Sequence, residues 1–183
     1  CTDRGFEACV LGQQVLGGHG YVAEWGLEQN VRDARIAQIY EGANGVQALD
    51  LMGRKTVRSN GELLAILSGE MDEFVASQND VEQMQPYLEA FAKCRAHLAE
   101  AVGAASYSYM EMMGLVLYCY MWQRILSAAL ADENSESADA DYRDALVKTG
   151  QFFMQRLLPR TESLLAEVRS GAGSLMALRA EQF

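Results

Sequence analysis

The chain has 183 residues, of which 50% are hydrophobic and 22% are charged, so it is long enough to bury one sizeable core or two small ones. Fifteen Lys and Arg against 25 Asp and Glu give a net charge of -10, which excludes nucleic acid and anionic membrane surfaces as favoured partners. No basic segment followed by an apolar run opens the sequence, so we expect a cytoplasmic protein without a signal peptide. The chain begins with Cys1 rather than Met, which favours a piece of a longer protein.

Four cysteines, at positions 1, 9, 94 and 119, form no C-x-x-C pair and no regular disulfide framework. This pattern suits reduced thiols that serve as buried packing residues. The two histidines, His19 and His97, do not have the spacing of metal ligands. We therefore predict no metal site.

Strong helix formers dominate the composition and almost no segment alternates like a strand, so we predict an all-α protein. The tandem glycines at 17–20 end the first helix, and Asn44 is a candidate N-cap for the third. Breaks are expected near Gly103 or Gly114 and at Pro159. Apolar residues recur at helical spacing in the segments 3–16, 27–36, 44–58, 62–77, 87–131 and 142–169.

The break at 59–61 is the predicted domain boundary, which divides the chain into residues 1–59 and 60–183. The second part is expected to form an antiparallel helical bundle with short loops. Its apolar run at 112–122 is shorter than the ~20 residues that cross a bilayer, so it predicts a buried helix and no membrane span.

Glu41 is the candidate catalytic residue. It follows the apolar segment 36–40, which is predicted to be buried, and it lies between Tyr40 and Gly42. Partial desolvation would raise the pKa of this carboxyl group towards the range that suits a general base. Many carboxylates in such settings are only capped or hydrogen-bonded, and that structural role is the more common one.

Three motifs carry a resemblance to a known family. In order and spacing they are QVLGGHGY at 14–21, RDAR at 32–35 and QIYEG at 38–42. Together they resemble the C-terminal signature of acyl-CoA dehydrogenases. The continuation at 45–55, GVQALDLMGRK, resembles the long bacterial branch of this family. Members of that branch carry an extra helical C-terminal domain, which would correspond to residues 60–183.

The resemblance implies an FAD-dependent oxidoreductase in which Glu41 removes the α-proton of an acyl-CoA thioester. Tyr40 and Gly42 would line the acyl pocket. Gln14, Gly17 and Gly18 would touch the FAD of a neighbouring subunit, while Ala43 and Gly45 would contact the cofactor through their backbone. The implied partners are an acyl-CoA substrate, electron-transfer flavoprotein or a similar acceptor, and further copies of the chain in a homo-oligomer, dimeric or tetrameric. The middle and N-terminal domains of the family are absent from this sequence, so the chain alone is expected to be inactive.

Two positions depart from the family pattern and leave an alternative open. Ala43 stands where the family usually has Thr, and Gly45 where a longer polar or acidic residue is frequent. The alternative is a non-catalytic acidic helical module for oligomerisation or interaction, with a degenerate site.

Overall fold

The computed structural model describes residues 1–40, 42–101, 105–131, 140–171, 173–174 and 177–182. Within these ranges the regular structure is helical throughout and no strand occurs, which confirms the all-α prediction. The chain divides into two compact units, Cys1–Asp50 and Leu51–Phe183. The domain boundary expected at residue 59 remains a prediction.

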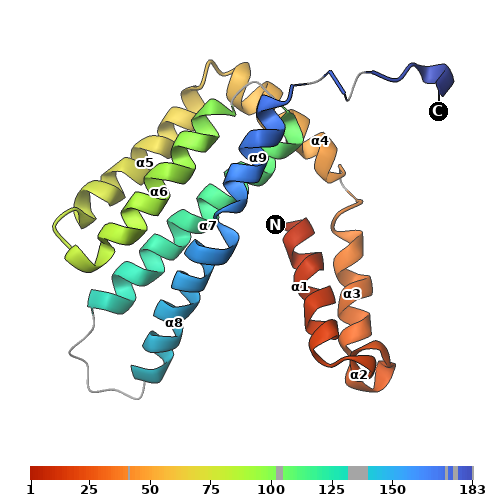
Figure 1. The fold of residues 1–183 in the computed structure, drawn as a ribbon, viewed down its shortest axis with the longest axis horizontal. Coiled ribbons are helices and arrows are strands. Elements are labelled where there is room, and N and C mark those ends of the chain that lie inside the picture. Colours follow the sequence, from red (N-terminus) through yellow and green to blue (C-terminus); the bar gives the residue numbers. More distant parts are fainter. Residues whose placement is uncertain (41, 102–104, 132–139, 172, 175–176, 183) are drawn as a thin grey trace. The chain divides into compact units, whose positions relative to one another are not determined.

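The first unit is a helical hairpin. Helix α1 (Thr2–Val15) packs antiparallel to α3 (Leu27–Ile36), and a short helix α2 (Gly18–Tyr21) and a 3-10 turn (Ala23–Trp25) connect them (Figure 1). Both long helices were predicted from the apolar spacing and the glycine breaks. Neither contains a fully buried residue, because two helices alone share only one face.

Two local predictions about this unit are wrong. The segment 36–40 was expected to be buried, but the side chains of Ile36, Ile39 and Tyr40 are each more than half exposed. The two long helices of the hairpin share only one face, so side chains that lie off that face stay exposed. Asn44 was expected to be an N-cap, but Ala43 holds that position and Asn44 is the first residue of helix α4 (Asn44–Leu49). Its side chain accepts a hydrogen bond from another element instead.

Helix α4 continues into a π-helical segment, Asp50–Val57, where one uninterrupted α-helix was predicted. The Arg58 N–H donates to the Gly53 carbonyl five residues earlier, at 3.0 Å. The Thr56 hydroxyl donates to the Leu51 carbonyl at 2.9 Å, and such a side-chain bond competes with the regular backbone ladder. The predicted break after this segment is present, since Asn60 and Gly61 both have positive φ.

Five α-helices occur in the described part of the second unit. Helices α5, α6 and α7 alternate in direction, as expected of the predicted antiparallel bundle, whereas α8 and α9 follow one another in the same direction (Figure 1). Helix α7 is the central element and packs against α6, α8 and α9. The proline positions explain two of the helix starts: Pro86 lies in the first turn of α6 and Pro159 is the N-cap of α9. The helices are α5 (Glu62–Gln78), α6 (Gln85–Glu100), α7 (Ser106–Ala131), α8 (Ala140–Phe152) and α9 (Arg160–Arg169).

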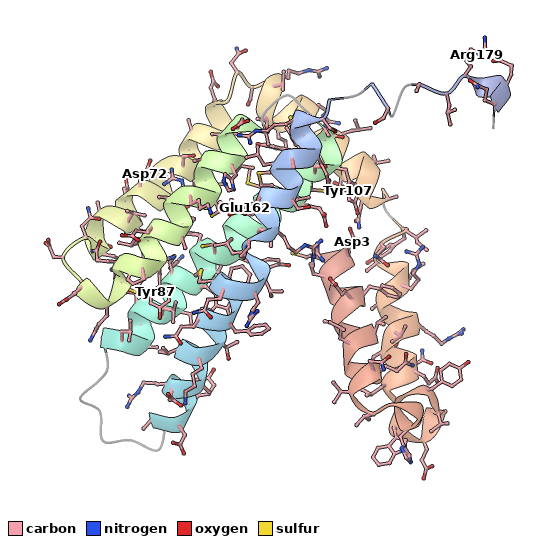
Figure 2. The ribbon with its side chains drawn as sticks, in the orientation of Figure 1. Asp3, Asp72, Tyr87, Tyr107, Glu162 and Arg179 are labelled. Atoms are coloured by element: carbon pink, nitrogen blue, oxygen red, sulfur yellow. The ribbon has the colours of Figure 1, made fainter. Side chains whose placement is uncertain are left out.

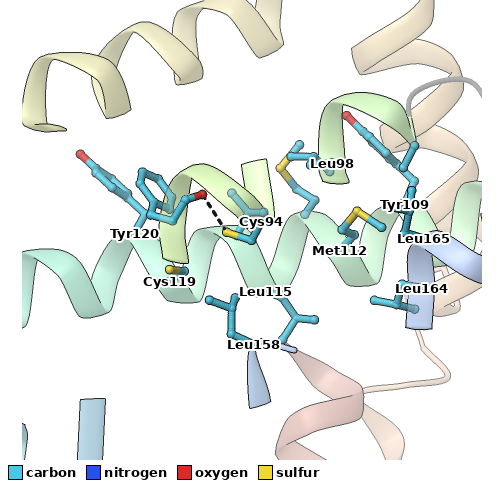
Figure 3. Packing of buried hydrophobic residues seen from close by; sticks show 14 of the residues in the cluster. Cys94, Leu98, Tyr109, Met112, Leu115, Cys119, Tyr120, Leu158, Leu164 and Leu165 are labelled. Atoms are coloured by element: carbon cyan, nitrogen blue, oxygen red, sulfur yellow. Dashed lines mark hydrogen bonds between the residues drawn. The ribbon is translucent and has the colours of Figure 1, made fainter. Parts of the chain in front are cut away.

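The core of the second unit is built around α7. The run 112–122, predicted to be a buried helix, buries most of its side chains, although Leu117 and Met121 remain exposed. Figure 3 shows Tyr109, Met112 and Cys119 along this helix, and each of the three is fully buried. None of the helices in the described part of the chain is long and apolar enough to span a membrane.

Two of the four cysteines have the packing role that was predicted. Cys94 and Cys119 are buried, whereas Cys1 is exposed and Cys9 is half-buried; all four are free thiols. The hydrogen bond with Cys119 and the burial of the thiol both raise the pKa of Cys94. A buried thiol that stays protonated is a poor nucleophile, so Cys94 is a structural residue.

A buried pair of hydroxyl groups ties the π-helical segment to α7. The Thr56 hydroxyl already donates to the Leu51 carbonyl, so at 3.1 Å it accepts the hydrogen bond from the Tyr109 hydroxyl. Both side chains are at least 97% buried. Burial raises the pKa of Tyr109 above its ordinary value.

We predict that Tyr109→Phe lowers the free energy of unfolding by about 1 kcal/mol at pH 8, because one buried hydrogen bond is lost. The difference from wild type should shrink above about pH 10, the ordinary tyrosine pKa. The raised pKa in the folded state means that the unfolded chain ionises Tyr109 first, so wild type loses stability as pH rises through this range and the Phe variant does not. Urea unfolding at pH 8 and pH 11 measures both effects; a constant difference would contradict the assigned burial effect.

Candidate functional site

The first group of predicted site residues lies at the C-terminal end of α1. Gln14, Gly17 and Gly18 are all exposed, and the Gly17 N–H donates to the Gln14 carbonyl at 3.0 Å. Gly17 has φ +57°, which an L side chain rarely adopts. A Cβ built at Gly17 or Gly18 would meet nothing within 4 Å, so this backbone is open to the approach of another molecule.

Gly20 organises this turn, although the sequence analysis did not single it out. It is the one fully buried residue of α2, and a Cβ added there would lie 2.1 Å from the Gln13 carbonyl oxygen. Only glycine therefore lets α2 come this close to α1. The signal for this contact was present in the GGHG motif, but a glycine in a turn does not reveal which backbone it touches.

We predict that Gly20→Ala destabilises the first unit by about 1–3 kcal/mol, because the methyl group forces α2 away from α1. Gly12→Ala is the matched control: it lies inside α1 with nothing within 4 Å of the added Cβ, so it should be neutral or stabilising by up to about 1 kcal/mol. Hydrogen exchange of the α1 amides, compared between the two variants, measures the effect. Equal protection in both would show that the close approach is not needed.

The second group of predicted site residues lies between α3 and α4. Gly42 has φ +91°, a backbone conformation that an L side chain rarely adopts, so the turn favours glycine. A Cβ there would also lie 2.9 Å from the Gln47 side-chain nitrogen, which is the movable end of a flexible side chain. Tyr40 is 53% exposed, and both Ala43 and Gly45 are exposed. Glu41, the predicted base, lies outside the described residues.

Side chains from the start of α1 hold both ends of this turn. The Gln38 side chain donates to Asp3 at 2.5 Å, and the Thr2 hydroxyl donates to Asn44 at 2.8 Å. Figure 2 shows Asp3 at the beginning of α1. Arg35 in turn donates to the Gln38 side-chain oxygen at 2.9 Å. Gln38 and Asn44, which lie before and after this turn, are therefore each held by α1 through contacts with residues that sequence reasoning did not select.

The hairpin keeps the two groups of site residues apart. Gly17 and Gly18 follow the C-terminal end of α1, whereas the turn at 40–45 is tied to its N-terminal end. The fourteen residues of α1 span about 21 Å at 1.5 Å per residue. One hairpin therefore presents two separate groups of candidate site residues and not a single closed site. No cluster of metal-ligating side chains occurs among the residues described by the structure.

Two family models match consecutive parts of the chain. The model described as "Acyl-CoA dehydrogenase, C-terminal domain" matches residues 1–55. The model described as "Acetyl-CoA dehydrogenase C-terminal like" matches residues 54–179. The first match therefore contains every residue of the candidate site, and the second spans the helical bundle.

Curated relatives give the same assignment. A 3-methylmercaptopropionyl-CoA dehydrogenase from Ruegeria pomeroyi is 32% identical over 96% of this chain and 32% of its own length. A broad-specificity linear acyl-CoA dehydrogenase, FadE5, from Mycobacterium tuberculosis is 27% identical over 97% of this chain and 33% of its own length. The short-chain specific mitochondrial enzyme of Homo sapiens is 52% identical, but over only 22% of this chain and 10% of its own length.

The chain spans about a third of the length of the first two relatives, and both similarities extend through the helical bundle. This agrees with the long bacterial branch that the sequence resembled. The chain belongs to the acyl-CoA dehydrogenase family, of which it carries the C-terminal helical regions.

Proposed function

We propose that the protein containing this chain is an FAD-dependent acyl-CoA dehydrogenase that introduces an α,β double bond into an acyl-CoA thioester, with Glu41 as the base. The observation that supports this best is the family match over residues 1–55, which includes all eight candidate residues. The described neighbours of Glu41 also support the proposal: Gly42 forms a sharp turn, and Gln38 and Asn44 are hydrogen-bonded to α1.

The proposed role of Glu41 follows from the acidity of the substrate. The α-proton of a thioester is weakly acidic, so the base must be held close to it and the enolate oxygen needs hydrogen-bond donors. The Glu41 backbone N–H is the proposed donor from this chain. Tyr40 and Gly42 would line the acyl pocket beside the base. Bound FAD supplies the acceptor for the β-hydride.

The proposed cofactor contacts fit an assembly of several subunits. Gln14, Gly17 and Gly18 lie at the far end of the hairpin from the Glu41 turn, so one hairpin cannot place both groups around one small reacting centre. We infer that Gln14, Gly17 and Gly18 face the FAD of a neighbouring copy in a homo-oligomer. Ala43 and Gly45 lack polar side chains, so their contribution would come from the exposed backbone before and within the first turn of α4.

The proposed partners are an acyl-CoA as substrate and electron-transfer flavoprotein or a similar protein as electron acceptor. The full-length protein tests this function directly. It should contain one FAD per subunit, and its visible flavin absorbance should bleach when an acyl-CoA is added without oxygen. A full-length protein that holds no flavin and does not bleach would overturn the proposal and favour a non-catalytic helical module.

A further inference from the structure

The second unit contains a cavity of about 270 Å³ between α5, α6 and α7. Its floor is made of Met71, Leu98, Met113 and Val116, which are all buried and apolar. The volume is nearly twice that of the ~150 Å³ apolar cavity that holds a benzene molecule in other proteins. A cavity of this size has room for a ligand larger than benzene, such as an alkyl chain of medium length.

The rim of the cavity differs from its floor. Ala96 and Ala99 of α6 are exposed there, so small side chains leave an opening between α5 and α6. Met71 and Met113 are unbranched and can adapt their shape to an occupant. The result is an apolar slot that is closed on the inside by the core and open along one helix.

The positively charged side chain of Arg95 lies at this opening. The Arg95 guanidinium carbon lies 5.5 Å from the centre of the Phe91 ring, and one of its nitrogens donates to the Asp72 carboxylate at 2.6 Å. Figure 2 shows Asp72 on α5. The side chain of Arg95 is 26% exposed and that of Asp72 is 63% exposed. The hydrogen bond from Arg95 lowers the pKa of Asp72, so the pair is charged at neutral pH.

We propose that this cavity binds a medium-length aliphatic carboxylate, with the chain on the apolar floor and the carboxylate on Arg95. The contact between Arg95 and Asp72 shows that this guanidinium already holds a carboxylate at the rim. A ligand carboxylate would replace that of Asp72, which is mostly exposed and returns to water at little cost. Guanidinium donors match the two oxygens of a carboxylate, which favours the acid over a neutral alcohol.

The probe is octanoate, and the readout is the methyl NMR signals of full-length protein labelled at methionine. Met71 and Met113 line the cavity, while Met84 is buried in a separate cluster and serves as the internal reference. We expect saturable shifts at Met71 and Met113 and none at Met84. Octanol should bind at least tenfold more weakly than octanoate. The absence of shifts at millimolar octanoate, or equal binding of the alcohol, would overturn the proposal.

Three variants test the assigned contacts. Arg95→Gln should weaken octanoate binding at least tenfold, and Asp72→Asn should tighten it several-fold because Arg95 loses its competing carboxylate. Ala99→Trp should abolish binding by filling the opening, and Ala96→Trp repeats that test at the neighbouring rim position. Circular dichroism confirms that each variant is folded. Weaker binding in Asp72→Asn, or undiminished binding in a folded Trp variant, would contradict the site. Because the readout is confined to the second unit, its failure leaves the proposed dehydrogenase activity untouched.

Discussion

Glu41→Gln in the full-length protein is expected to lower kcat for acyl-CoA oxidation by about 10²–10⁴-fold, the usual contribution of a general base. Glutamine has nearly the same shape but cannot accept the α-proton, so the chemical step is lost and binding is largely kept. Flavin content should stay at the wild-type level, because the proposed FAD contacts involve other residues. Stopped-flow reduction of the bound flavin by an acyl-CoA measures the step directly.

Glu24→Gln provides the matched control for this experiment. Glu24 is an exposed residue in the 3-10 turn of the same unit and belongs to neither group of candidate site residues. Its replacement should therefore leave kcat unchanged. A Glu41→Gln protein with full flavin and wild-type rate would exclude Glu41 as the base. A similar loss in both variants would instead indicate that negative charge on this unit, and not one carboxylate, supports the reaction.

Phe91→Ala is expected to cost about 3–5 kcal/mol of unfolding free energy in the second unit. Phe91 is 1% exposed and stacks on Tyr120, with ring centroids 6.0 Å apart. Its ring also supports the Arg95 guanidinium. The substitution removes the ring from between α6 and α7 and leaves a cavity that these helices cannot easily close. Chemical denaturation followed by circular dichroism measures the loss.

Phe152→Ala is the control for the same chemical change at the surface. Phe152 ends α8 and is 57% exposed, so its truncation should change stability by no more than about 0.5 kcal/mol. If both variants lost the same stability, the packing assigned to Phe91 would not be the cause.

Features set by neighbouring residues were predictable from the sequence. Helices α3 and α5 begin and end close to where their apolar spacing and flanking glycines indicated. The break after the π-helical segment is marked locally by Asn60 and Gly61. Such signals act over a few residues, so one sequence suffices to identify them.

Features set by distant contacts were not predictable. The π-helical segment depends on Thr56, whose partner Tyr109 is 53 residues away. The residues on either side of the Gly42 turn are held by Thr2 and Asp3. Thr2 lies 42 residues before its partner Asn44, and Asp3 lies 35 residues before its partner Gln38. Burial was the other failure: the segment 36–40 is apolar, but exposure depends on which elements cover it, and the hairpin alone offers too few.

The π-helical segment Asp50–Val57 links chain length to helical pitch. A π-turn holds one residue more than an α-turn. Deleting one residue, such as the exposed Gly53, would therefore allow α-helical pitch while the residues on either side of the deletion keep their present faces. Forcing α-helical pitch without shortening the segment would instead leave one residue too many in the turn, and each extra residue rotates an α-helix by about 100°. A redesign of this segment therefore has to change its length and its pitch together, even where the individual residues are exchanged.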